Sequence, residues 1–198
     1  MKHLRSFLAT ELARSPHLAE ARAELEATIA MSQKAGDRST VLRGWSHLAW
    51  VALRQHDVAL AAEMARRAGE LAGDFPTVEC AELVPTVLVW VAWKQGRLDE
   101  AERQAERARC NPRKDPFHST GQVFAGRVFP IVAIRLAAGR VGEAVDAARE
   151  LLSALPPTPD EVVGAISDAV NAWDAGDQKA TAEKLAAAFR LAEDLQLV

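Results

Sequence analysis

Apolar and polar positions along the chain alternate in a way that predicts helices arranged in pairs. Residues Val87 to Trp93 are almost wholly apolar, and the run breaks at Gly96. After Leu98 an alanine-rich, charged segment follows, from Glu100 to Arg109. Two helices of this length joined by a turn of about five residues form an αα-hairpin. This stretch therefore predicts one hairpin, with Gly96 in its turn.

The same pattern recurs along the chain and predicts a repeat protein. When Gly96 is counted as position 15 of a unit, the corresponding turn residues are Pro16, His56, Gly139 and Gly176. Small residues follow at positions 20 and 27, such as Ala61 and Ala68 in the second unit. One hairpin cannot bury its apolar face alone, so neighbouring units must stack. We expect one all-α solenoid domain over residues 1–198, with repeats at about 2–41, 42–81, 82–124, 125–161 and 162–198.

Glycine and proline mark where the predicted helices end. Gly36 and Gly73 each close a helix before polar residues that are suited to begin the next one. The longest predicted turn covers residues 110–120, and a proline-rich turn at 156–160 ends in Asp160, a candidate N-cap. Pro130 interrupts the first helix of the fourth unit, which must be kinked there or begin later.

These units resemble tetratricopeptide repeats. Trp45-x-x-Leu48-Ala49, followed by Ala61 and Ala68, is similar to the W-x-x-L-G … A … A skeleton of that family, and residues 95–101 (QGRLDEA) resemble its inter-helix turn. The period of about 40 residues differs from the family's 34, and alanine or valine replaces the usual glycine at position 8. The longer period is similar to that in the C-terminal regions of large bacterial transcription regulators. The resemblance implies a right-handed α-solenoid.

The resemblance also implies a binding surface, because the first helix of each such repeat lines the concave face through positions 2, 5, 9 and 12. Carried over by register, these positions and their neighbours give the candidate partner-binding residues Trp50, Trp90, Trp93, Phe129, Trp173, His47, Arg43, Arg54 and Lys94. They predict an aromatic-lined groove for a partner peptide or helix, or for a small apolar effector. In that case replacing Trp90 and Trp93 with alanine abolishes binding and leaves helicity intact. Two alternatives stay open: the indole rings pack between repeats, or a homodimer covers them.

Composition narrows the classes of function. The net charge of −3 is the opposite of the basic excess expected of a nucleic-acid-binding protein, so no direct nucleic-acid contact is expected. The longest apolar run, Leu83 to Trp93, is too short to cross a bilayer, and no signal-peptide stretch opens the chain. The two cysteines, Cys80 and Cys110, are too few for a disulfide framework. A cytoplasmic location is expected.

Catalytic and metal-binding patterns do not stand out in the sequence. The five histidines form no metal-ligand spacing, although Cys110 and His118 share one predicted loop. Residues 121–126 (GQVFAG) superficially echo a phosphate-binding loop, but no strand precedes them. We therefore expect a non-enzymatic regulatory binding module without metal or cofactor. A small helical enzyme, a sequestration protein for an apolar metabolite and a structural self-assembly unit remain the alternatives.

Overall fold

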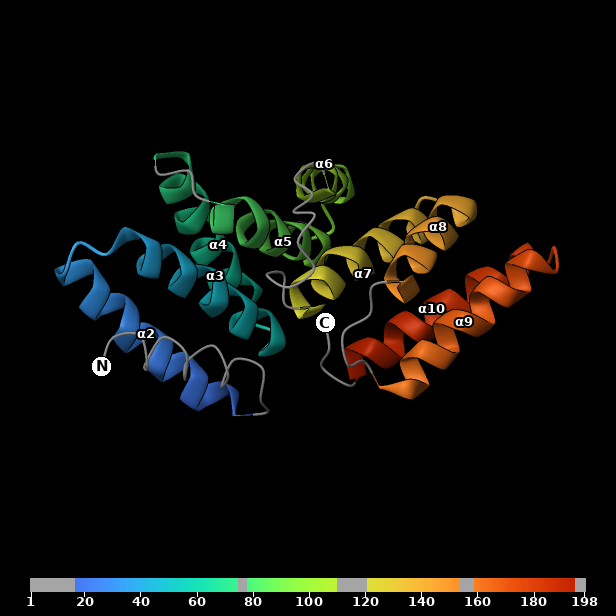
Figure 1. Ribbon diagram of the computed structural model, residues 1–198, viewed down its shortest axis with the longest axis horizontal. Helices are drawn as coiled ribbons and strands as arrows, with labels where there is room; N and C mark the ends of the chain where they lie inside the picture. Colours follow the sequence, from blue (N-terminus) through green and yellow to red (C-terminus); the bar gives the residue numbers. More distant parts are fainter. Residues whose placement is uncertain (1–16, 75–77, 110–120, 154–158, 195–198) are drawn as a thin grey trace. The chain divides into compact units, whose positions relative to one another are not determined.

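The computed structural model describes residues 17–74, 78–109, 121–153 and 159–194, and every regular element in these ranges is an α-helix (Figure 1). The all-α prediction is confirmed. In chain order the helices are α2 (Leu18–Lys34), α3 (Arg38–Arg54), α4 (Val58–Asp74), α5 (Val78–Lys94), α6 (Leu98–Arg109), α7 (Gly121–Ala137), α8 (Val141–Ser153), α9 (Asp160–Asp174) and α10 (Gln178–Asp194). They fall into two compact units, residues 1–97 and 98–198, which are described separately below.

The helix ends differ from the predicted ones at several places. The long turn at 110–120, with Cys110 and His118, and the first predicted helix before residue 17 lie outside the described residues. Residues 121–126 belong to helix α7 and are not a loop. The same helix continues through Pro130 to Ala137, so of the two alternatives predicted for it, a kink or a later start, the later start is excluded. Asp160 is the first residue of α9 and Pro159 occupies the N-cap, which corrects the predicted cap.

Three-residue turns of one geometry connect the helices of each described pair. In the turn after α5, the Gly96 N–H donates to the Trp93 carbonyl and the Arg97 N–H donates to the Ala92 carbonyl, both at 2.9 Å. This is the Schellman pattern, which needs a left-handed residue at its centre. The same backbone hydrogen bonds recur, with positive φ at the central residue, in the turns centred on Gly36, His56, Gly139 and Gly176.

The next residue of the turn begins the following helix. Asp37 accepts a hydrogen bond from the Thr40 N–H at 3.1 Å, and Asp57 accepts one from the Leu60 N–H at 3.0 Å. A side-chain acceptor at this place satisfies one of the unpaired N–H groups at the start of a helix. The turns are therefore three residues long, shorter than the five or so predicted around Gly96, and at Asp37 and Asp57 one residue both ends a turn and caps the next helix.

His56 is the exception at the centre of these turns and gives a stability prediction. Its φ is +60°, a conformation that costs a residue with a Cβ about 1–2 kcal/mol. The His56→Gly variant should relieve this strain, partly offset by the greater backbone entropy of glycine in the unfolded chain. We expect the free energy of unfolding to rise by about 0.5–1 kcal/mol. Urea titrations followed by circular dichroism measure this change.

The matched control for His56 is the equivalent turn at Gly96. Gly96→Ala places a Cβ in the same left-handed conformation, at φ +71°, and should lower stability by about 1 kcal/mol. A His56→Gly variant less stable than the parent would show that the imidazole makes a contact worth more than the strain.

Unit 1 is built around α3. This helix packs against α2, α4 and α5, and in Figure 1 it lies between α2 and α4. At Gly44 the Ile29 side chain of α2 packs so closely on the α3 backbone that a Cβ would lie 2.6 Å from the Ile29 Cγ1. On the opposite side, Leu42, Ala68 and Val84 form a buried cluster against which Trp45 packs. Trp45 thus has the packing role that the repeat register predicts for it.

Unit 2 has a different pattern of contacts. Helix α7 packs against α6, α8 and α10, and α8 also packs against α9. Helix α10 therefore also packs against α7, the first helix of the preceding pair. Buried apolar side chains from α7, α8, α9 and α10 meet in the centre and form the core of this unit.

Small buried residues occupy the same position in every predicted repeat. Position 20 is fully buried in all five predicted repeats, and in the last four it lies five residues after a described turn centre; its occupants are Ala21, Ala61, Ala101, Ala144 and Thr181. Small side chains at this place let the second helix of each pair approach its neighbours closely. The register inferred from the sequence is therefore reflected in burial.

Candidate binding surface on α3 and α5

One face of α3 carries the candidate residues Arg43, His47, Trp50 and Arg54. Their spacing of four, three and four residues places them in a single stripe along the helix. All four side chains are half-buried, because α3 has neighbours on several sides and only part of its surface is left to solvent. Helix α3 contains no Asp or Glu. The stripe therefore combines an indole ring with positive charge and no carboxylate of its own helix.

The C-terminal half of α5 adds to this surface. The ring centroids of Trp50 and Trp90 lie 5.9 Å apart at an interplanar angle of 86°, an edge-to-face pair. The Lys94 ammonium lies 6.0 Å from the centroid of the Trp90 ring, within the range of a cation–π interaction. Trp50 and Trp90 share position 9, and Arg54 and Lys94 share position 13 of neighbouring units. The equivalent residues Trp50 and Trp90 of two neighbouring repeats are thus in contact.

Arg54 is the last residue of α3 and lies at the C-terminal end of the stripe. Partial burial lowers the pKa of its guanidinium, because desolvation disfavours the charged form. An arginine side chain nevertheless remains protonated at any physiological pH. A cation kept in a partly dehydrated place attracts a carboxylate more strongly than one surrounded by water.

The aromatic residues predicted to line the groove fall into two groups, half-buried ones and fully buried ones. Trp50, Trp93 and Trp173 are half-buried, whereas Trp90 is 1% exposed and Phe129 3% exposed. Trp90 and Phe129 are therefore core residues, as in the alternative in which rings pack between helices. In unit 2, the Trp173 ring lies against α8, where a Cβ at Gly142 would be 3.3 Å from it. Trp50 and Trp93, with Arg43, His47, Arg54 and Lys94, make up what we call the α3–α5 surface.

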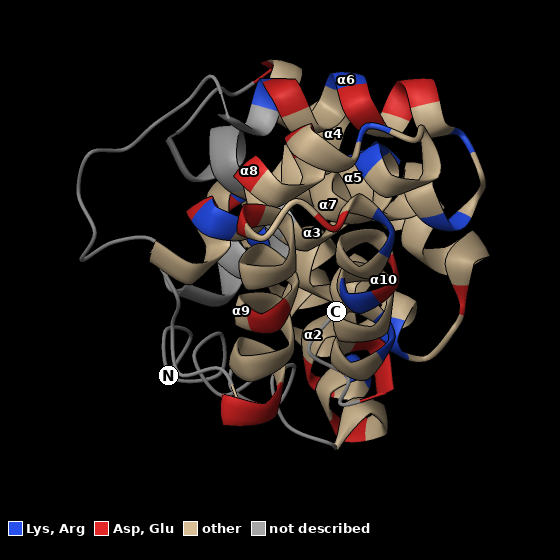
Figure 2. Ribbon diagram, turned by 90° about the vertical axis from the view of Figure 1, so that its right-hand side faces the viewer, with Lys and Arg blue, Asp and Glu red and all other residues tan. Residues whose placement is uncertain are grey.

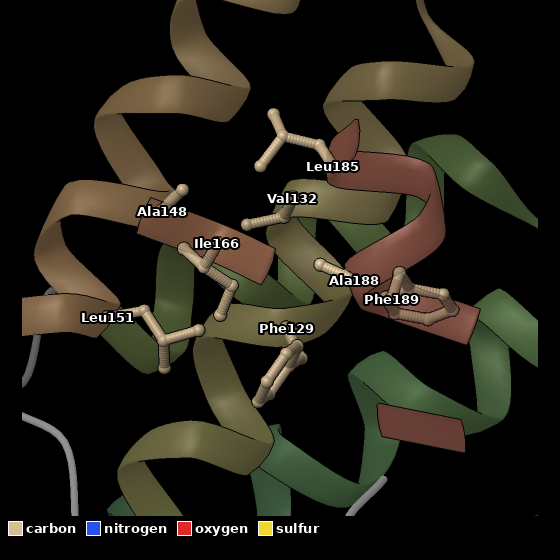
Figure 3. Close-up of a pocket in the computed structure, with 8 residues that line it drawn as sticks. All are labelled: Phe129, Val132, Ala148, Leu151, Ile166, Leu185, Ala188 and Phe189. Atoms are coloured by element: carbon tan, nitrogen blue, oxygen red, sulfur yellow. The ribbon is translucent and has the colours of Figure 1, made fainter. Parts of the chain in front are cut away.

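A small apolar cavity lies in the core of unit 2 (Figure 3). The eight side chains around it come from α7, α8, α9 and α10, and all are buried; they are Phe129, Val132, Ala148, Leu151, Ile166, Leu185, Ala188 and Phe189. The space between them holds no more than about one water molecule. The cavity is therefore a packing gap in the core and too small for a metabolite. The sequence does not indicate it, because the contact between α7 and α10 does not follow from the repeat pattern.

A charged network in unit 2 was also missed by the sequence analysis. The Arg135 guanidinium donates to the Glu143 carbonyl at 2.9 Å and lies 3.6 Å from a carboxylate oxygen of Glu106. Arg140 pairs with Glu102 and Glu143, and its hydrogen bond to Glu102 raises the pKa of its guanidinium. Only 10% of the Arg135 side chain is exposed. The network ties α6 to α7 and α8, a structural role.

Two further findings concern metals and membranes. Among the residues that the structure describes, no three or more His, Cys, Asp or Glu side chains come together as a metal site. None of the described helices has both the length and the apolar character needed to cross a bilayer.

Comparison with family models, curated proteins and solved structures gave no match.

Proposed function

We propose that the chain is a non-enzymatic, regulatory binding module built from tetratricopeptide-like repeats in a right-handed solenoid, and that it acts in the cytoplasm. The α3–α5 surface is its binding site. The observation that carries this proposal is the stripe Arg43–His47–Trp50–Arg54, which runs beside the Trp50–Trp90 pair and Lys94. The repeated Schellman turns and the fully buried position 20 support the repeat identity.

The length and chemistry of the surface favour a protein segment as the partner. From Arg43 to Arg54 the stripe is roughly 16 Å long at 1.5 Å per residue, which suits several turns of a helix or an extended peptide. Its cations, without a carboxylate on α3, favour acidic side chains, and the half-buried rings of Trp50 and Trp93 favour apolar ones. The partner segment is therefore acidic and amphipathic.

Site-specific photo-crosslinking tests the proposed surface. His47 is replaced by a photoreactive phenylalanine analogue, because it lies in the middle of the stripe and is only half-buried. The matched control places the same analogue at Glu70, an exposed residue of α4. We expect a specific adduct in cells from position 47 and none from position 70. Equal adducts from both positions, or none from either, would contradict the proposal.

Charge removal then tests the chemistry of the same surface. Arg43→Gln combined with Arg54→Gln should weaken binding of the crosslinked partner by at least about tenfold, because hydrogen bonds to charged groups contribute about 1.5–3 kcal/mol each. Arg66→Gln with Arg67→Gln, on exposed positions of α4, is the control with the same change of charge. Fluorescence anisotropy with the identified segment measures both.

A further inference from the structure

Charge is segregated between two helices that are equivalent in the repeat register. Helix α3 carries Arg38, Arg43 and Arg54 and no carboxylate, and Arg38 pairs with Asp74 of α4, so Arg43 and Arg54 are the cations that α3 contributes to the α3–α5 surface. Helix α9 carries four carboxylates and neither Lys nor Arg; they are Asp160, Glu161, Asp168 and Asp174. Figure 2 shows acidic segments along α9 with no basic segment between them. The two helices are therefore complementary in charge.

The carboxylates of α9 remain accessible in unit 2. Asp168 and Asp174 pair with Lys184 and Arg149, yet their side chains are 68% and 58% exposed. Asp160 and Glu161 are exposed as well. An exposed carboxylate with one cation partner can still accept further hydrogen bonds, since it has two oxygens.

Helix α9 also has apolar residues beside its acidic ones. Val163 and Val170 are half-buried and lie seven residues apart, two helical turns, on one side of α9. The helix has 15 residues, about 22 Å at 1.5 Å per residue, and α3 has 17. An acidic, amphipathic helix of matching length is the kind of segment that the α3–α5 surface is proposed to bind.

We infer that the chain binds a second copy of itself, with α9 of one copy docked on the α3–α5 surface of the next. This inference rests on the proposed function and names the partner of its surface. The two faces differ, so the contact is heterologous and each copy keeps one free α3–α5 surface and one free α9. Chains longer than two copies therefore form as the concentration rises.

Light scattering on the purified full-length chain tests the inference. We expect the mass to rise above 21.4 kDa with concentration at about 50 mM salt, and to fall toward 21.4 kDa at about 1 M salt, where the screening length is only about 3 Å. Two variants each remove one side: Arg43→Gln with Arg54→Gln on α3, and Asp160→Lys with Glu161→Lys on α9. Each variant alone should stay monomeric at both salt concentrations.

Mixing the two variants is the decisive step. The α3 variant keeps its α9, and the α9 variant keeps its α3–α5 surface, so the mixture should form a 1:1 dimer of about twice 21.4 kDa and nothing larger. Circular dichroism checks that both variants are folded, and the α9 changes lie on exposed residues. Asp194→Lys with Glu183→Lys, on exposed positions of α10, is the control with the same charge change and should associate as the parent does.

Three results would overturn the inference: a parent chain that is monomeric at every concentration, association that persists in either variant, or a mixture that stays monomeric. The proposed function fails separately. A monomeric parent chain that still gives a specific adduct with another protein from position 47 would keep the α3–α5 surface as a binding site and reject only the second copy as its partner.

Discussion

Replacing Trp90 with alanine is expected to lower the free energy of unfolding of unit 1 by about 3–5 kcal/mol, the range for removing a large buried aromatic side chain. Trp90 is 1% exposed and is among the largest fully buried side chains of the chain. Its ring also makes the edge-to-face contact with Trp50, worth about 0.5–1.5 kcal/mol beyond burial. A loss of this size is a large part of the 5–15 kcal/mol that stabilises a typical domain.

Trp93→Ala is the matched control, because Trp93 lies on the same helix, has the same ring and is half-buried. Its substitution should cost no more than about half as much, in proportion to the smaller area that it buries. Urea unfolding followed by circular dichroism gives both values, and hydrogen exchange shows whether the loss lies in unit 1. A Trp90→Ala variant that keeps full stability would mean that the ring lies on an open face, as the groove prediction has it.

Short sequence patterns were enough to predict the turns and the small buried residues of the fold. Four of the five described turns have glycine at their centre with positive φ, such as Gly96. In three of the five, an aspartate follows and accepts a hydrogen bond from the amide three residues on, as Asp37 does. Within a repeat, the fully buried position 20 lies five residues after the turn centre, as Ala61 and Ala101 show. These features depend on residues close together in the sequence, so their spacing is enough to find them.

The depth of burial was not readable in the same way. Trp50 and Trp90 occupy the same position of neighbouring units, yet Trp50 is half-buried and Trp90 is in the core. The register tells which face of a helix a residue occupies, but the neighbouring helices decide how much of that face is covered. A sequence pattern therefore proposes candidates for a binding surface, and only the packing separates Trp50 and Trp93 from Trp90.

Contacts between distant helices were also beyond the sequence pattern. Nothing in the sequence near Arg135 indicates that Glu106 and Glu143 will lie beside it. The packing of α7 against α10 likewise joins helices about 60 residues apart, a distance over which the hydrophobic period carries no information. Those contacts enclose the cavity of unit 2, which Leu151 lines.

Leu151→Ala should destabilise unit 2 by about 3–5 kcal/mol, near the upper end of the range for leucine. Leu151 is fully buried, and its side chain already borders the cavity that Figure 3 shows. Truncation merges the lost volume with the existing gap, and the cost rises with the size of the void that remains. Leu152→Ala is the control: the next residue is half-buried and does not line the cavity, so its loss should be about 1 kcal/mol.

The enlarged cavity should also acquire a property that the parent chain lacks. Its walls are apolar throughout, and an apolar cavity of this kind stays dry and takes up small apolar molecules. Benzene should therefore raise the unfolding temperature of the Leu151→Ala variant and leave the parent and Leu152→Ala unchanged, because a ligand stabilises only the state that binds it. Thermal unfolding with and without benzene measures this shift. A variant that loses stability but gains none with benzene would show that α7, α8 and α10 collapse into the space, and the measured cost would then fall toward 2 kcal/mol, the lower end of the range.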